Sequence, residues 1–182
     1  MDDIVKQAMA KWPQVPDCYG WLGLDDRGDW YMRDDAVQAQ GDFARAKGSK
    51  LVHTQLIAFI ERNYGVDDSG RWYFQNGPQR VYVELQSTPF VWRVQDDGAL
   101  THAQQTVALT DTLLDENGRL YALTSMGLGL VHSMDIWHAA KAIEDKRWPT
   151  PQAVVSEQLP QTYGYVRSPA NGEKKPADKP VC

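Results

Sequence analysis

The chain has 182 residues and a formal net charge of -5, with 19 Lys and Arg against 24 Asp and Glu. Binding along a nucleic-acid backbone needs clustered cations, so this charge argues against a nucleic acid as partner. The two cysteines, Cys18 and Cys182, are too few and too far apart for a disulfide framework or a structural zinc site, which favours reduced thiols and a cytoplasmic location.

The amino-terminal residues predict a helix rather than an export signal. Asp2 and Asp3 stand where a secretory signal carries positive charge, and no later apolar run approaches the roughly 20 residues that span a bilayer. We therefore expect neither export nor a membrane span. Residues 2–12 place apolar side chains at helical spacing, and the two aspartates suit the positive end of the helix dipole. Pro13 and Pro16 end this helix.

A β-hairpin and a second helix follow. Residues 19–24 and 29–32 are apolar segments on either side of a polar turn, which predicts two antiparallel strands. The polar stretch 33–48 fits a weak helix and a surface loop equally well. After it, Ser49 is the expected N-cap of an amphipathic helix, and Gly65 is the expected C′ residue at its end.

Further along, the apolar pattern changes to a period of two, which is typical of strands. Six short segments show it: 72–74, 80–85, 90–94, 106–109, 120–123 and 128–131. Short strands in series predict an antiparallel meander, and Gly127-Leu-Gly129 is expected to relieve crowding in its strand. Ser133 is the expected N-cap of a closing helix. The face that lies on the sheet is predicted to contain Ile136, Trp137, Ala140 and Ile143.

Composition and pattern divide the chain into three parts. Residues 1–65 are expected to form a unit of helix, hairpin and helix, and residues 66–148 an antiparallel sheet with its closing helix. Residues 149–182 are expected to form a Pro- and Lys-rich tail that is loosely attached, with 153–155 and 163–166 as its anchors on the sheet or on a second subunit. The predicted fold class is therefore α+β, built from repeated hairpin and helix units.

A turn motif recurs along the chain. Residues 24–32 (LDDRGDWYM) return as 66–74 (VDDSGRWYF) and 114–122 (LDENGRLYA), and residues 94–100 are a looser copy. The first Asp can accept hydrogen bonds from the turn amides and the Gly can take a positive φ, so each copy predicts a chain reversal. An EF-hand loop needs alternating oxygen ligands and a later bidentate Glu, which no copy supplies, so we expect no metal site.

Several short motifs resemble the bacterial family catalogued as domain of unknown function 1285. They are GDWY at 28–31, KLV at 50–52 in the helix that runs to Phe59, DSGRWY at 68–73, GP at 77–78, VYVE at 81–84 and PF at 89–90, within about residues 19–145. The resemblance implies two α+β parts made from repeated motifs, the second with a pleckstrin-homology-like sheet and a closing helix. It transfers no catalytic residue. The stretch 33–48 and the tail after Pro149 have no counterpart in the family pattern.

The sequence contains no assembled catalytic motif. The histidines, which are His53, His102, His132 and His138, form no metal-ligand signature such as His-Glu-x-x-His. Ser125 and Ser133 lack the flanking glycines of a nucleophile elbow, and Gly127-Leu-Gly129 lacks the other residues of a phosphate-binding loop. We therefore expect no cofactor, and we assign no catalytic residue.

Aromatic and cationic residues supply the candidate binding site. Alternating strand positions can present flat rings beside guanidinium groups, a surface that suits a small anionic or aromatic ligand. The candidate residues are Trp72, Arg80, Tyr82, Trp92, Arg93 and His53. The competing interpretation is that the rings are half-buried packing residues and that the arginines lie on the wet face.

The expected function is a non-enzymatic ligand- or protein-binding module, regulatory or signalling, with a groove between its two parts. One alternative is a small hydrolase or transferase whose site assembles only in the fold, with His53, His132 or the turn carboxylates as participants. Another is a structural homo-oligomer, which a large apolar patch or an unpaired sheet edge would indicate.

Overall fold

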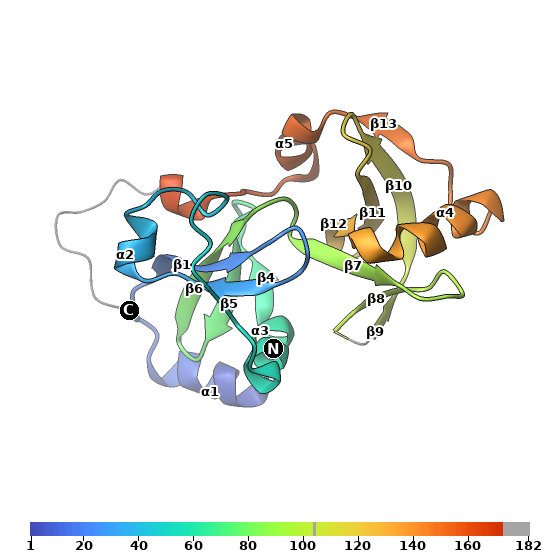
Figure 1. Ribbon diagram of the computed structural model, residues 1–182. Helices are drawn as coiled ribbons and strands as arrows, with labels where there is room; N and C mark the ends of the chain where they lie inside the picture. The colour runs from blue at the N-terminus through green and yellow to red at the C-terminus, as the bar shows by residue number, and fades with distance from the viewer. Residues whose placement is uncertain (104, 173–182) are drawn as a thin grey trace. The chain divides into compact units, whose positions relative to one another are not determined.

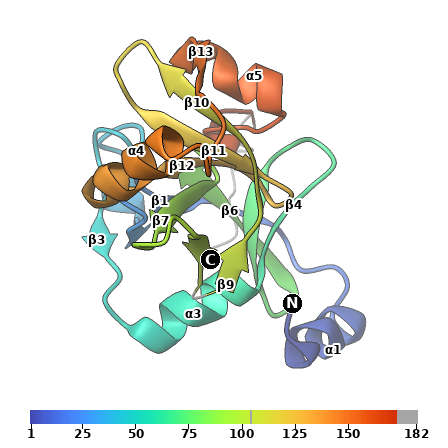
Figure 2. The ribbon, with the colours of Figure 1, turned by 90° about the vertical axis from the view of Figure 1, so that its right-hand side faces the viewer.

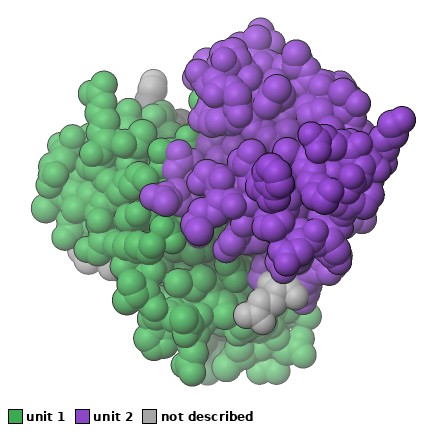
Figure 3. Space-filling view, turned by 45° about the vertical axis from the view of Figure 1, so that its right-hand side comes forward, with its two compact units in different colours: residues 1–25, 29–86, 166–182 green, residues 26–28, 87–165 purple. Residues whose placement is uncertain are grey.

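The computed structural model describes residues 1–103 and 105–172. Figure 1 shows the ribbon, and Figure 2 shows it turned by 90°. The described residues form five α-helices and two sheets, of six and seven strands, so the α+β class is confirmed. They divide into two compact units, coloured separately in Figure 3. Unit 1 comprises residues 1–25, 29–86 and the chain from residue 166, and unit 2 comprises residues 26–28 and 87–165.

The six-stranded sheet belongs to unit 1 and has the strand order β3-β2-β1-β6-β5-β4. Its strands are β1 (Cys18–Leu24), β2 (Trp30–Met32), β3 (Ser49–Lys50), β4 (Tyr64–Val66), β5 (Trp72–Asn76) and β6 (Gln79–Leu85). The predicted hairpin is confirmed, because β1 pairs antiparallel with β2. On its other side β1 pairs parallel with β6, a strand far away in the sequence. The predicted boundary between residues 65 and 66 falls inside β4, whereas the two units divide elsewhere.

The helices of unit 1 are α1 (Asp3–Lys11), α2 (Asp35–Gln38) and α3 (Thr54–Arg62). The first confirms the helix predicted over residues 2–12, and α2 is a single turn in an otherwise irregular stretch. The third begins later than predicted. Its N-cap is His53, whose Nδ1 accepts a hydrogen bond from the backbone N–H of Leu56 (3.2 Å), while Ser49 lies in β3. Gly65 does not end the helix either, since it lies in β4 without a positive φ.

The seven-stranded sheet belongs to unit 2 and has the order β13-β10-β11-β12-β7-β8-β9. Its strands are β7 (Phe90–Val94), β8 (Leu100–His102), β9 (Gln105–Val107), β10 (Leu109–Asp115), β11 (Leu120–Thr124), β12 (Gly127–Val131) and β13 (Gln152–Val154), and its helices are α4 (Ile136–Glu144) and α5 (Leu159–Tyr163). The predicted antiparallel meander is wrong, because β7 pairs parallel with β12 and β10 pairs parallel with β13. Parallel neighbours need long connections, which the intervening strands and α4 provide. The pleckstrin-homology-like arrangement is not confirmed.

Trp92 lies at the centre of the unit 2 sheet and is fully buried. Its ring stacks on Phe90, with 4.8 Å between ring centroids, and its indole N–H donates to the carbonyl oxygen of Ala122 (2.9 Å). Gly129 lies against this ring, and a Cβ added there would overlap the indole. The prediction that this glycine relieves crowding in its strand is therefore confirmed.

The four predicted turns are confirmed. Their glycines are Gly28, Gly70, Gly98 and Gly118, all with φ between 75° and 81°. In the three closer copies the first Asp accepts a hydrogen bond from the backbone N–H four residues later, at 2.8–2.9 Å. In the looser copy Asp97 binds the backbone N–H of Ala99 instead (2.9 Å). The carboxylate and the glycine thus fix each reversal locally.

Helix α4 presents a different face from the predicted one. The chain first makes a 3₁₀ turn over Ser133–Asp135, and the side chain of His132, rather than that of Ser133, caps it. The α-helix therefore begins later and is rotated relative to the prediction. Ala139 and Ala142 are buried, whereas Trp137, assigned to the packed face, is 75% exposed.

Residues 149–172 are folded, so the prediction of a loosely attached tail is wrong for them. Strand β13 and helix α5 belong to unit 2, and Leu159 at the start of α5 is 2% exposed. From residue 166 the chain returns to unit 1, where the backbone N–H of Leu85 donates to the carbonyl oxygen of Arg167 (2.7 Å). Residues 173–182 lie outside the described residues.

The structure also bears on compartment and membrane. Cys18 is nearly buried and Cys182 lies outside the described residues, so the expectation of reduced thiols stays a prediction. The cytoplasmic location, which rested partly on those thiols, stays a prediction. In the part of the chain that the structure describes, every helix is too short or too polar to traverse a lipid bilayer.

Candidate functional site

Unit 2 contains a shallow pocket of about 370 Å³ between strand β13 and helix α5. The two elements lie side by side in both ribbon views (Figures 1 and 2). Ala153, Val154 and Val155 line one side of the pocket, and Leu159, Thr162 and Tyr163 of α5 line the other. Successive side chains of an extended segment point to opposite faces, so a pocket that touches three consecutive residues reaches the backbone edge of the strand. Among the described strands, β13 pairs with β10 alone.

The local sequence explains how this pocket forms. Pro151 cannot donate a backbone hydrogen bond and precedes β13, and the β-branched Val154 and Val155 favour an extended chain. Pro160 lies in the first turn of α5, where a proline is tolerated. Gly164 then ends the helix in the left-handed conformation, with φ 65°. These signals place a short strand and a short helix against each other.

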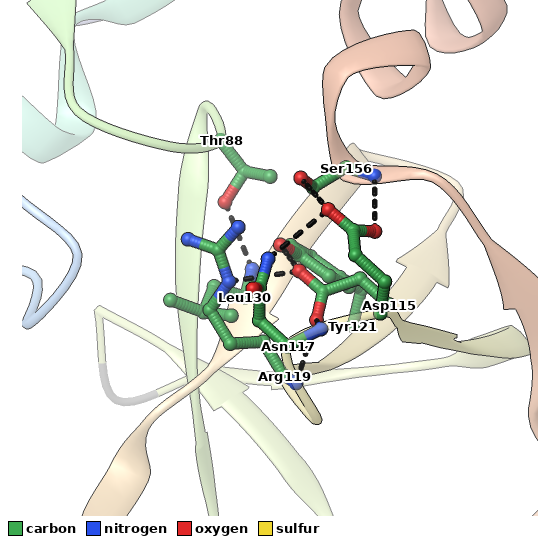
Figure 4. Close-up of polar contacts among 8 residues, drawn as sticks. Thr88, Asp115, Asn117, Arg119, Tyr121, Leu130 and Ser156 are labelled. Carbon is green, nitrogen blue, oxygen red and sulfur yellow. Dashed lines mark hydrogen bonds and ion pairs between the residues drawn. The ribbon is translucent and has the colours of Figure 1, made fainter.

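Asp115, the last residue of β10, is the centre of a polar network next to the pocket (Figure 4). Its carboxylate accepts four hydrogen bonds, from the backbone N–H groups of Asn117 (2.9 Å) and Arg119 (2.8 Å), from Nε of Arg119 (2.8 Å) and from the hydroxyl of Tyr121 (2.8 Å). Burial by itself would raise the pKa of Asp115, but these hydrogen bonds hold the pKa below its ordinary value. Burial, reinforced by the Asp115 charge, raises the pKa of Tyr121.

Glu116 connects this turn to the segment that leads into α5. Ser156 donates to it twice, from the backbone N–H (2.8 Å) and from Oγ (2.5 Å). These hydrogen bonds lower the pKa of Glu116. The turn therefore fixes the start of α5, and with it one wall of the pocket.

Unit 1 contains the same combination of groups at another copy of the turn. The carboxylate of Asp67 accepts hydrogen bonds from Nε of Arg71 (2.8 Å) and from the hydroxyl of Tyr82 (3.0 Å). In the first copy, Nζ of Lys47 lies 2.9 Å from the carboxylate of Asp25. In each case a carboxylate meets a cation, which stabilises the turn. At Asp67 and Asp115 the hydrogen bonds also lower the pKa of the carboxylate, which makes it a poor proton acceptor.

Three of the predicted site residues, Trp72, Arg80 and Tyr82, lie on strands β5 and β6 of unit 1. Tyr82 is 1% exposed, and its ring stacks on that of Tyr19 with 4.6 Å between centroids. The guanidinium of Arg80 lies over the ring of Tyr73, 4.7 Å from its centroid, and the hydroxyl of Tyr82 helps to raise the pKa of Arg80. Trp72 is nearly buried. Arg80 and Tyr82 are therefore brought together, within a packed aromatic cluster.

The other three serve packing and capping in the described structure. Trp92 is buried in the centre of the unit 2 sheet, and Arg93 binds the carboxylate of Asp135 (2.6 Å). His53 of unit 1 caps α3 through Nδ1. His132 caps its 3₁₀ turn in the same way (3.2 Å). Nδ1 of His53 and Nδ1 of His132, the histidines that the hydrolase alternative would use, therefore both accept capping hydrogen bonds.

The pocket residues are absent from the predicted site. Their signal in the sequence was the apolar pair Val154 and Val155 within a proline-rich stretch, which indicated an anchor rather than a binding surface. Within residues 1–103 and 105–172, no three His, Cys, Asp or Glu side chains are grouped so that they could hold a metal ion.

Comparisons with known proteins give families without an assigned activity. No curated protein matches the chain. A crystal structure of a DUF1285 family protein from Silicibacter pomeroyi DSS-3 matches with 12% identity and a TM-score of 0.47, over 68% of this chain and 70% of that one. This is the family that the sequence motifs resemble. A family model matches residues 1–170, and the chain belongs to the family described as "Protein of unknown function (DUF2946)".

Proposed function

We propose that the protein is a non-enzymatic protein-binding module that takes up an extended polypeptide segment along strand β13. The observation that carries the proposal is the position of the pocket, which opens beside the edge strand of the unit 2 sheet. An edge strand presents backbone N–H and C=O groups on its outer side, and an added strand can pair with them.

The pocket supplies the side-chain part of such recognition. Its volume of about 370 Å³ lies within the range of ligand pockets, about 300–1,000 Å³. Val155 is 48% exposed beside it, so apolar surface is available at the edge. Since β13 is only three residues long, we expect weak binding, with a dissociation constant on the order of 10 μM or weaker.

We propose a protein, rather than a small anionic or aromatic ligand, as the partner. The rings of Trp92 and Tyr82, which would stack on such a ligand, are buried. A catalytic function has less support, because Asp67 and Asp115 are held by hydrogen-bond donors and their pKa values are lowered. Regulation or signalling is the kind of role in which weak uptake of an extended segment is common.

A peptide titration tests the proposal. The probe is the end-capped heptapeptide Ser-Val-Gln-Val-Gln-Val-Ser, added to the ¹⁵N-labelled full chain and followed by NMR. We expect saturable shifts of the backbone amides of residues 152–155, 158–159 and 161–163. Two variants should abolish them: Val155→Asp, which places a charge beside the pocket, and Thr162→Trp, which fills it.

Met126→Asp is the matched control, because Met126 is 44% exposed, lies in the same unit and does not line the pocket. Binding that survives both pocket variants, or shifts confined to other residues, would contradict the proposal, as would no binding at all. Sedimentation of the chain without peptide tests the homo-oligomer alternative. If the chain forms a concentration-dependent dimer that Val155→Asp dissociates, the partner at β13 would be a second copy of this chain.

A further inference from the structure

Two carboxylates contact residues at or near the two ends of strand β13, beside the pocket. Residues 148–166, which form β13, α5 and their connections, contain Glu157 and no Lys, Arg or His. The neighbouring strand β10 contains Asp111 and Asp115 and no cation. Arg119, which follows β10, donates to the carboxylate of Asp115. The charged side chains of β10 and its turn that contact the pocket segment are the carboxylates of Asp111 and Glu116.

Asp111 is the carboxylate best placed to meet a bound segment. Its Oδ1 accepts from the backbone N–H of Thr112 (2.8 Å), and its Oδ2 accepts from the side-chain amide of Gln152, the first residue of β13. Tyr163 lines the opposite side of the pocket and feels the charge of the same carboxylate. Its pKa is raised first by burial and then by the negative charge of Asp111. Asp111 thus lies at the end of the pocket where β13 begins.

Glu116 adds a second charge near the other end of the strand. It is held against Ser156, directly beyond the pocket residue Val155. A segment laid along β13 would therefore have a carboxylate near each end of that strand. This arrangement repels an acidic segment and attracts a basic one.

We infer that the segment bound along β13 is basic, with a Lys or Arg side chain that reaches the carboxylate of Asp111. This inference rests on the proposed function and specifies the chemistry of its partner. A partly exposed ion pair is worth up to about 1 kcal/mol, so a basic side chain should strengthen binding up to about five-fold. The preference should weaken with salt, since the Debye length falls to roughly 3 Å at 1 M.

Three end-capped heptapeptides test the inference, with the full chain and fluorescence polarisation as the readout. They are Ser-Val-Lys-Val-Lys-Val-Ser and the two versions with Gln or Glu in place of both lysines, each carrying the same dye. We expect the Lys peptide to bind most tightly and the Glu peptide most weakly. Asp111→Asn should reduce the ratio of the Lys and Gln affinities at least two-fold, and 0.5 M NaCl should reduce it as well.

The Gln peptide and a second acidic residue provide the controls. An unchanged affinity for the Gln peptide shows that Asp111→Asn leaves the pocket intact. Asp96→Asn removes the same charge from a side chain that is 98% exposed in the same unit and outside the pocket, and it should preserve the Lys preference. Equal affinities for the Lys and Glu peptides would overturn the inference while leaving the proposed function standing, and an equal effect of the two variants would overturn the role of Asp111. Failure of all three peptides would remove the proposed function and the inference together.

Discussion

Replacing Asp115 by Ala should lower the free energy of unfolding of unit 2 far more than any other substitution in the turns of that unit. The change removes four hydrogen bonds to a buried carboxylate and leaves the hydroxyl of the fully buried Tyr121 without this acceptor. Hydrogen bonds to charged groups contribute about 1.5–3 kcal/mol each, but bonds that share one acceptor are not additive. We therefore expect a loss of about 3–5 kcal/mol in the free energy of unfolding.

Urea unfolding followed by tryptophan fluorescence measures this loss. With a slope of about 2 kcal/mol per molar urea, the midpoint should fall by about 1.5–2.5 M. Asp97→Ala is the matched control, because Asp97 occupies the looser turn of the same unit and accepts a single backbone hydrogen bond at an exposed position. Its expected loss is at most about 1 kcal/mol. If the two variants had midpoints within 0.5 M of each other, the network around Asp115 would not be the main stabiliser of the turn.

Two further predictions concern pH and packing. Burial lowers the pKa of His102, so folding favours its neutral form, and this contribution to stability is lost as the pH falls below the unfolded pKa near 6.5. The wild type should therefore lose free energy of unfolding relative to His102→Gln between pH 7.5 and 5.5 in urea titrations, and a constant difference would contradict this. Gly129→Ala should cost about 1–3 kcal/mol by pushing against the indole of Trp92, and should also change the near-ultraviolet circular dichroism. Gly118→Ala meets open space but keeps a φ of 75°, so it should cost about 1 kcal/mol and leave that spectrum unchanged.

The features that the sequence predicts well depend on neighbouring residues. The turns are local, since one carboxylate, one glycine and the backbone between them determine each reversal. The hairpin of β1 and β2 follows from its turn in the same way. Helix α3 exists as predicted, but a histidine can also act as an N-cap, so the choice of Ser49 over His53 misplaced its start.

The features that the sequence does not predict depend on distant pairing. Nothing local to β1 specifies β6 as its parallel neighbour, and nothing local to β10 specifies β13. The pocket exists because β13 lies at the edge of that sheet, so the residues around Val155 could not be recognised as a site without the pairing. For Trp92, the alternation along the strand predicted which face of the sheet its side chain would share. It did not reveal that Gly129 makes room for the Trp92 ring in the core.

The return of the chain to unit 1 at residue 166 has a consequence for biosynthesis. The ribosome synthesises residues 87–165, which contain nearly all of unit 2, before it synthesises the segment that completes unit 1. Until then, the carboxylate of Glu84, which is nearly buried in the finished fold, lacks the two donors that Ser168 and Ala170 provide. The unit whose translation begins first is thus the last to be completed, and a released chain that ends at residue 165 should carry a protease-resistant unit 2 beside a protease-sensitive amino-terminal part.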